Sequence, residues 1–130
     1  MAAIPKVVEE RLGFYVYAYI DPANGEIFYL GKGKGDRALA HLSDRSETRK
    51  VARITRIRAS GQEPLIDILV HGLPSEEAAL RIEAAVIDAI GCDRLTNEVR
   101  GWQSGKVGRM PLIELVHLYG AKSVAVKHQY

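Results

Sequence analysis

The stretch that decides the fold is FYVYAYIDPANGEIFYLG, residues 14–31. Within residues 14–20, Tyr15, Tyr17 and Tyr19 alternate with apolar side chains, and a period of two in aromatic and β-branched residues is typical of a strand. Residues 21–25 carry turn chemistry, because proline fixes φ and the Asn-Gly pair tolerates positive φ. Residues 26–31 then return as a second strand, so the stretch predicts an antiparallel β-hairpin.

One more strand and several helices are expected beyond the hairpin. Residues 64–70 are mostly aliphatic and predict a third, more buried strand. Helices are expected over residues 36–42, 46–60, 75–90 and 109–119, and the last three each precede a glycine, the usual residue just past a helix end. Asp36 and Ser75 suit N-caps. Residues 123–127 are consistent with either a short edge strand or a loose tail.

Length and composition fit one globular domain. The chain has 130 residues, 47% of them hydrophobic and 26% charged, with no repeat and no low-complexity run. The charged N-terminus lacks the apolar core of a signal peptide, and no stretch reaches the roughly 20 apolar residues of a membrane span. Cys92 is the single cysteine, which fits a reducing compartment, and the four histidines show no zinc-site spacing. We therefore expect a soluble cytoplasmic protein.

Charge is unevenly distributed along the chain. Residues 31–60 hold nine Lys and Arg against three Asp and Glu, whereas residues 61–99 hold two against eight. Such segregation favours a basic face for a polyanion, with the acidic segment turned elsewhere or holding a cation. Charged helix faces that are merely solvated are the alternative.

Glu83 falls on the apolar side of the helix expected over residues 75–90. It lies three residues after Leu80 and four before Ile87, whereas Asp88 is expected to face solvent. A carboxylate on an apolar face is costly unless it is paired or bound to a metal. The pattern therefore leaves two interpretations, a buried salt bridge to an arginine or a metal ligand.

The glycine-rich loop after the hairpin suits phosphate binding. Residues 31–35, GKGKG, match neither the phosphate-loop motif nor the dinucleotide fingerprint. They still offer flexible backbone amides and the ammonium groups of Lys32 and Lys34 ahead of a helix N-terminus. A tyrosine that acts as a base needs its pKa, ordinarily about 10, lowered, and we expect these cations together with Arg37 to do this for Tyr17 or Tyr29.

Two further sets of basic residues share a helix face. Arg37 and His41 are four residues apart, where Arg37 is suited to clamp a phosphate and His41 to relay a proton or contact the backbone. Ordinary surface positions are the alternative. A basic stripe on the following helix is a candidate DNA track; it consists of Arg49, Arg53 and Arg56.

Together these residues resemble the GIY-YIG endonuclease superfamily. The likeness is closest to the branch found in ankyrin-repeat and LEM-domain nucleases and in small stand-alone bacterial or phage proteins, and it covers about residues 13–101. The first motif is Tyr15-Val16-Tyr17, with Tyr15 where the family has Gly, and the second is Tyr29-Leu30-Gly31. The remaining functional positions follow in the family's order; they are Arg37, His41, Glu83 and Asn97.

The resemblance implies an α+β fold, a small three-stranded antiparallel sheet flanked by helices, with an extra C-terminal helix. Residues 1–12 would be an N-terminal extension, residues 13–101 the nuclease domain, and residues 102–130 a helix and tail packed on or extending it. The implied activity is hydrolysis of DNA phosphodiester bonds, with DNA that is double-stranded or branched as the partner. The implied cofactor is one Mg²⁺, for which Mn²⁺ can substitute.

The resemblance also implies roles for single residues. Tyr17 would activate the attacking water, with His41 as proton acceptor. Charge on the phosphate would be stabilised by Arg37 and Tyr29, with a further contact from Lys32. The metal would be held by Glu83, and Asn97 would orient its neighbours.

Two other functions compete with the endonuclease. The first is a non-catalytic nucleic-acid-binding module that keeps the nuclease fold, for which Tyr15 in place of Gly is the hint. The second is a phosphate-binding regulatory domain that uses the glycine-rich loop.

Overall fold

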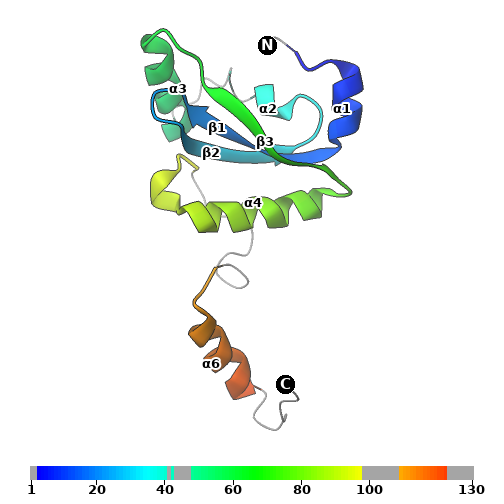
Figure 1. Ribbon diagram of the computed structural model, residues 1–130, viewed down its shortest axis with the longest axis vertical. Helices are drawn as coiled ribbons and strands as arrows, with labels where there is room; N and C mark the ends of the chain where they lie inside the picture. The colour runs from blue at the N-terminus through cyan, green and yellow to red at the C-terminus, as the bar shows by residue number, and fades with distance from the viewer. Residues whose placement is uncertain (1–2, 41, 43–47, 98–108, 123–130) are drawn as a thin grey trace.

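The central feature of the protein is a three-stranded antiparallel sheet of order β2-β1-β3 (Figure 1). This is a computed structural model, and it describes residues 3–40, 42, 48–97 and 109–122. The strands are β1 (Phe14–Asp21), β2 (Glu26–Gly33) and β3 (Leu65–Leu73). The hairpin β1–β2 forms as predicted, and its turn ends at Gly25 with a φ of 73°. The expected α+β fold with a three-stranded antiparallel sheet is therefore confirmed.

The alternation along β1 builds two cores, one on each face of the sheet. Tyr15, Tyr17 and Tyr19 pack with α2 (Arg37–Ala40) and α3 (Arg49–Ala59). On the other face, Ala18 and Leu30 pack against α4 (Glu76–Ile90), which runs beneath the sheet in Figure 1. Because β1 is the central strand with both faces covered, its five residues from Tyr15 to Tyr19 are fully buried.

The expectation that the third strand is more buried is wrong. β3 lies at the edge of the sheet, where β1 is its one partner strand among the residues that the structure describes. Leu65 is 53% exposed, and Ile68 and Leu69 are each 38% exposed. A run of aliphatic residues predicts a strand but not its place in the sheet, because that place depends on which faces the helices cover.

The predicted helices form, with changes at their ends. α4 has the predicted N-cap, since the Ser75 hydroxyl accepts a hydrogen bond from the Ala78 N–H. α3 begins after Thr48, whose extended backbone and side-chain bond to the Val51 N–H make it the N-cap, so the expected start at residue 46 is wrong. α2 is shorter than residues 36–42. Within the described ranges, two elements were not predicted; they are α1 (Lys6–Leu12) and the 3₁₀ helix η2 (Cys92–Arg94).

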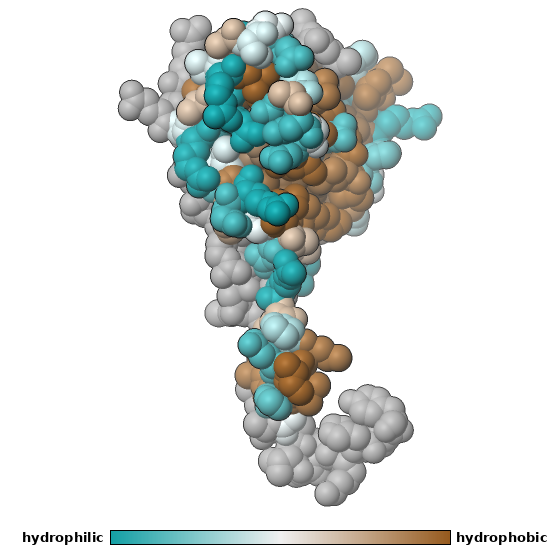
Figure 2. All heavy atoms as spheres, turned by 60° about the vertical axis from the view of Figure 1, so that its left-hand side comes forward, coloured by the Kyte–Doolittle hydropathy of each residue, from teal (hydrophilic) through white to brown (hydrophobic). Residues whose placement is uncertain are grey.

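The last helix, α6 (Leu112–Lys122), is shifted from its expected position at residues 109–119. It begins behind Pro111, whose carbonyl accepts hydrogen bonds from the first turn, and it continues through Gly120. A glycine inside a helix costs only about 1 kcal/mol, so it does not by itself end one. α6 extends away from the sheet in Figure 1, and Figure 2 shows apolar side chains on its surface. Residues 123–127, the expected edge strand or tail, lie outside the described residues.

Asp88 is buried rather than solvent-facing as expected. Its carboxylate accepts a hydrogen bond of 3.4 Å from the Arg109 N–H, and the Arg109 guanidinium donates to the Asp88 and Ala89 carbonyls. Arg109, just before α6, therefore covers this part of α4. Among the described residues, none of the helices has the length and apolarity needed to cross a membrane.

Candidate active site

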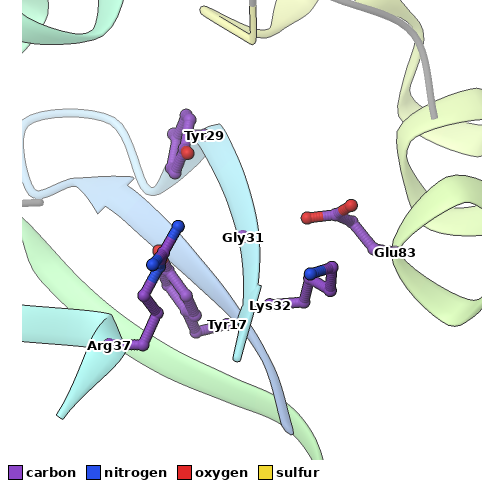
Figure 3. A pocket seen from close by; sticks show the side chains of 6 residues that line it. All are labelled: Tyr17, Tyr29, Gly31, Lys32, Arg37 and Glu83. Atoms are coloured by element: carbon purple, nitrogen blue, oxygen red, sulfur yellow. The ribbon is translucent and has the colours of Figure 1, made fainter. Parts of the chain in front are cut away.

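Side chains from four elements line a hollow of about 110 Å³ at the sheet surface (Figure 3). β1 contributes one residue, β2 three, α2 one and α4 one; they are Tyr17, Tyr29, Gly31, Lys32, Arg37 and Glu83. Five of these residues are candidates from the sequence, although up to 66 positions separate them along the chain. The structure therefore brings the predicted tyrosines, cations and carboxylate to one place.

Tyr17 is fully buried, and its hydroxyl has no hydrogen-bond partner among the described residues. Burial raises its pKa well above the usual value for tyrosine, and the neighbouring Tyr29 and Tyr19 raise it further. Arg37 opposes this shift but is outweighed by burial. The expectation that nearby cations lower this pKa is therefore wrong for the protein alone, and Tyr17 is a neutral phenol at neutral pH.

The two flanking tyrosines of β1 have bonded hydroxyls. The Tyr15 hydroxyl donates to the Gly35 carbonyl at 2.8 Å and accepts from the Ala38 N–H at 2.9 Å. The Tyr19 hydroxyl donates to the Ala38 carbonyl at 2.7 Å. Of the three tyrosines of β1, Tyr17 is thus the one whose buried hydroxyl has no hydrogen-bond partner among the described residues.

Arg37 begins α2 and is exposed, and its side chain points toward Tyr17 and Tyr29 in Figure 3. The stem of the side chain crosses the backbone of Gly33, where an added Cβ would lie 2.8 Å from the Arg37 Cβ. The glycine-rich loop thus lets the arginine lie directly against the strand end. An exposed guanidinium held in this way is suited to contact a phosphate from the solvent side.

Glu83 faces the hollow from α4 and is half-buried. Burial raises the pKa of its carboxyl above the usual value, and Lys32 opposes that shift. The carboxylate has no hydrogen bond or ion pair with another described residue. The alternative of a buried salt bridge to an arginine is therefore not found among these residues.

Lys32 lies between two carboxylates. Its Nζ is 2.8 Å from Oε1 of Glu76, and the resulting ion pair holds the pKa of Glu76 below its usual range. Lys34 lies apart from the hollow, with its Nζ 5.3 Å from the centre of the Phe14 ring. The structure thus separates the two lysines of the loop, and Lys32 is the one at the site.

A hard divalent cation such as Mg²⁺ fits the residues around the hollow only if water and substrate oxygens complete its coordination shell. Among the described residues, no group of three or more His, Cys, Asp or Glu is arranged to hold a metal. Mg²⁺ commonly keeps several waters and binds through one or two carboxylates together with phosphate oxygens. The half-buried carboxylate of Glu83, which has no ion pair with another residue that the structure describes, suits that mode of binding.

Asn97 is bonded to the backbone of β2, outside the hollow. Its side chain accepts from the Leu30 N–H at 3.1 Å and donates to the Leu30 carbonyl at 2.8 Å. Thr96 donates two hydrogen bonds to the Phe28 carbonyl, one from its hydroxyl and one from its backbone N–H. These bonds give partners to backbone groups of Phe28 and Leu30, the residues on either side of Tyr29 in β2. The predicted role of Asn97, which is to orient its neighbours, is compatible with this placement. His41 lies outside the described residues.

The basic stripe on α3 is not uniform. Arg49 donates to the Leu95 carbonyl, and Arg53 lies 3.0 Å from the carboxylate of Asp21, so both have structural contacts. Arg56 is exposed. Sequence analysis missed Lys50, which is buried with its Nζ 4.8 Å from the centre of the Tyr29 ring. The sequence pattern could have indicated this burial, because Lys50 precedes the buried Ile54 by four residues and therefore lies on the apolar face of the helix.

The fold and this site define a GIY-YIG-type nuclease domain. A sequence model of the LEM-3-like GIY-YIG domain matches residues 24–122, and the chain belongs to that family. Searches of curated proteins and of solved structures found no match. The match begins in the β1–β2 turn, after Tyr17, and it extends through α6. Tyr17 lines the same hollow as the matched residues, and its role there stays a prediction. Membership supports a nuclease-type function that acts on DNA, in a family that commonly uses a divalent metal.

Proposed function

We propose that the protein is a Mg²⁺-dependent endonuclease that hydrolyses DNA phosphodiester bonds. The observation that supports this most strongly is the convergence at one hollow of a phenol, an exposed guanidinium and a carboxylate, which are Tyr17, Arg37 and Glu83. Within the part of the chain that the structure describes, neither the phenol hydroxyl nor the carboxylate has a hydrogen-bond partner. Phosphodiester hydrolysis needs a group to hold the water, positive charge at the phosphate and a cation at the leaving oxygen. The site offers candidates for all three.

Tyr17 is the proposed residue for the attacking water. Its hydroxyl is buried beside the hollow and has no partner among the described residues, so we propose that a small shift of the ring lets it hydrogen-bond a water molecule there. Burial keeps the phenol neutral, and it becomes a competent base only when added positive charge lowers its pKa. His41 remains the predicted acceptor of the proton.

Arg37, Tyr29 and Lys32 are the proposed phosphate contacts. They lie around the same hollow, and a guanidinium and an ammonium both stabilise charge that develops on phosphate oxygens. Glu83 would hold Mg²⁺ (Mn²⁺ as a substitute), and when bound the ion supplies charge neutralisation at the leaving oxygen. Lys34 and Arg56 are proposed to contact flanking DNA. Arg49 and Arg53 belong to the same predicted stripe, and their proposed part is to support it from their contacts with Leu95 and Asp21. We propose branched or flapped DNA as the preferred substrate.

Cleavage assays on supercoiled plasmid and on a branched duplex test this proposal. Wild type with Mg²⁺ should nick the DNA, and Glu83→Gln should lower the rate at least about a hundredfold while DNA binding persists. Glu77→Gln is the matched control, because Glu77 is an exposed carboxylate on the same helix that pairs only with Arg81 among the described residues. It should cleave as wild type does.

The remaining outcomes separate the competing functions. A wild-type protein that binds DNA but never cleaves it contradicts the nuclease and supports the non-catalytic binding module. A protein that binds inorganic phosphate but not DNA supports the regulatory phosphate-binding domain.

A further inference from the structure

We infer that Tyr15 is a positioning residue, which places the Arg37 guanidinium at the hollow by holding the backbone on both sides of that arginine. The inference rests on the proposed role of Arg37 at the phosphate. It concerns a residue that does not line the hollow and whose side chain does not reach it.

The Tyr15 hydroxyl spans the loop that carries Arg37. It donates to the carbonyl of Gly35, two residues before the arginine, and accepts from the N–H of Ala38, the residue after it. Both bonds are short, at 2.8 Å and 2.9 Å, and the Tyr15 side chain is fully buried. The bond from the Ala38 N–H is buried, so breaking it is costly because that N–H has no solvent to replace the phenol, whereas the bond to the Gly35 carbonyl is partly buried.

The helix that begins with Arg37 needs this support. α2 has only four residues, and a single helical turn gains too few hydrogen bonds to offset the entropy of forming it. Its stability must therefore come from tertiary contacts. Tyr19 supplies one of these by donating to the Ala38 carbonyl, and Ala38 itself is buried against the tyrosines.

Side-chain packing completes the placement of the arginine. The Arg37 stem crosses Gly33 so closely that no Cβ fits between them. With the backbone bonded at Gly35 and Ala38 and the stem set against Gly33, the remaining freedom lies at the guanidinium end. These contacts thus fix the position of the Arg37 guanidinium, although the preceding segment is rich in glycine and would otherwise be mobile.

The test is a double-mutant cycle that combines Tyr15→Phe with Arg37→Ala. Tyr15→Phe keeps the ring and removes only the hydroxyl, and we expect kcat/KM for DNA cleavage to fall about tenfold to a hundredfold. If Tyr15 acts through Arg37, Tyr15→Phe should have almost no further effect once Arg37 is alanine. Ser60→Ala is the control, because it removes a hydroxyl-to-carbonyl bond at the end of α3 and should combine multiplicatively with Arg37→Ala.

The same cycle is run on DNA affinity without metal, alongside hydrogen exchange of the Ala38 amide. The amide should be protected in wild type and exchange faster in Tyr15→Phe. Effects that multiply in both cycles, or an Ala38 amide that stays protected, would overturn the inference. If Tyr15→Phe does not fold, Tyr19→Phe enters the same cycle and should also couple to Arg37→Ala.

The two proposals fail in different ways. Absence of cleavage by wild type sinks the proposed function, and the affinity cycle and Ala38 exchange then decide the role of Tyr15. If wild type cleaves DNA but Tyr15→Phe and Arg37→Ala act independently, the proposed nuclease function is supported and the positioning role of Tyr15 is contradicted.

Discussion

The phenol ring of Tyr17 covers the Cα of Gly31 across the β1–β2 pair. The two residues are register partners, and a Cβ added at Gly31 would lie 2.7 Å from the Tyr17 Cε1, with other ring atoms closer still. Gly31 is itself buried, and a methyl group added to it would collide with the Tyr17 ring. The absence of a side chain at Gly31 is therefore what lets the Tyr17 hydroxyl reach the hollow.

Gly31→Ala should displace the Tyr17 ring. We expect a loss of about 1–3 kcal/mol of unfolding free energy from overpacking and at least about a hundredfold loss of cleavage, because the hydroxyl moves with the ring. Chemical denaturation and plasmid cleavage measure the two effects. Gly120→Ala in α6 is the control, since nothing lies within 4 Å of its added Cβ, and it should be neutral or stabilising. Wild-type activity in Gly31→Ala would show that the ring has room to move.

Lys32 should contribute to DNA affinity through its charge. Replacement by alanine removes one cation from the hollow, so the slope of log affinity against log salt should become shallower by about 0.9, the value for one phosphate contact on duplex DNA. Glu76→Gln removes the carboxylate that pairs with Lys32 and should leave binding equal or tighter. Fluorescence anisotropy at several salt concentrations measures both. An unchanged slope in Lys32→Ala would place the lysine outside the DNA contact.

The arginines of α3 should divide into structural and DNA-binding residues. Arg53→Ala should cost about 1–3 kcal/mol of unfolding free energy, because the Arg53 guanidinium is bonded to the buried Asp21 and lies over the Phe28 ring. Arg56→Ala, at an exposed position, should change stability by less than about 0.5 kcal/mol and weaken DNA binding. Thermal unfolding and anisotropy separate the two. Equal stability losses in both variants would contradict the division.

Stability should fall in acid through Asp21. The Ala23 N–H bonded to its carboxylate, together with the Arg53 guanidinium, holds the pKa of Asp21 below its usual value, so the folded protein binds fewer protons there than the unfolded chain. The contribution is therefore present above the ordinary aspartate pKa of about 3.9 and is lost as the pH falls through the folded-state pKa.

Asp21→Asn tests this pH dependence. It should be less stable than wild type near neutral pH and should lose less stability between about pH 5 and about pH 3. Urea unfolding at several pH values measures the effect, and Glu10→Gln, at an exposed carboxylate, should follow the wild-type curve. Parallel curves for Asp21→Asn and wild type would exclude a role for this group.

Several features could be predicted from the sequence because their causes are local. The β1–β2 hairpin follows from the alternation of residues 14–20 and the turn before Glu26, and α4 follows from the Ser75 cap and its helical period. Glu83 stood out because the same period places a carboxylate among apolar residues. The resemblance to the GIY-YIG superfamily then predicted Arg37 and Asn97 as site residues from their order along the chain. In each case the signal is carried by residues a few positions apart or by a motif in a fixed order.

Other features depend on which elements surround a residue, and only the tertiary structure decided them. The edge position of β3 depends on the helices that cover the sheet, and the burial of Asp88 depends on the segment at Arg109. The tyrosines of β1 show the difference most clearly. The sequence by itself determined that Tyr15 and Tyr17 share a face. Only the structure decided that Tyr15 is bonded to a loop, while the Tyr17 hydroxyl is buried with a raised pKa and no partner among the residues described. Desolvation and long-range hydrogen bonds arise from packing between distant segments.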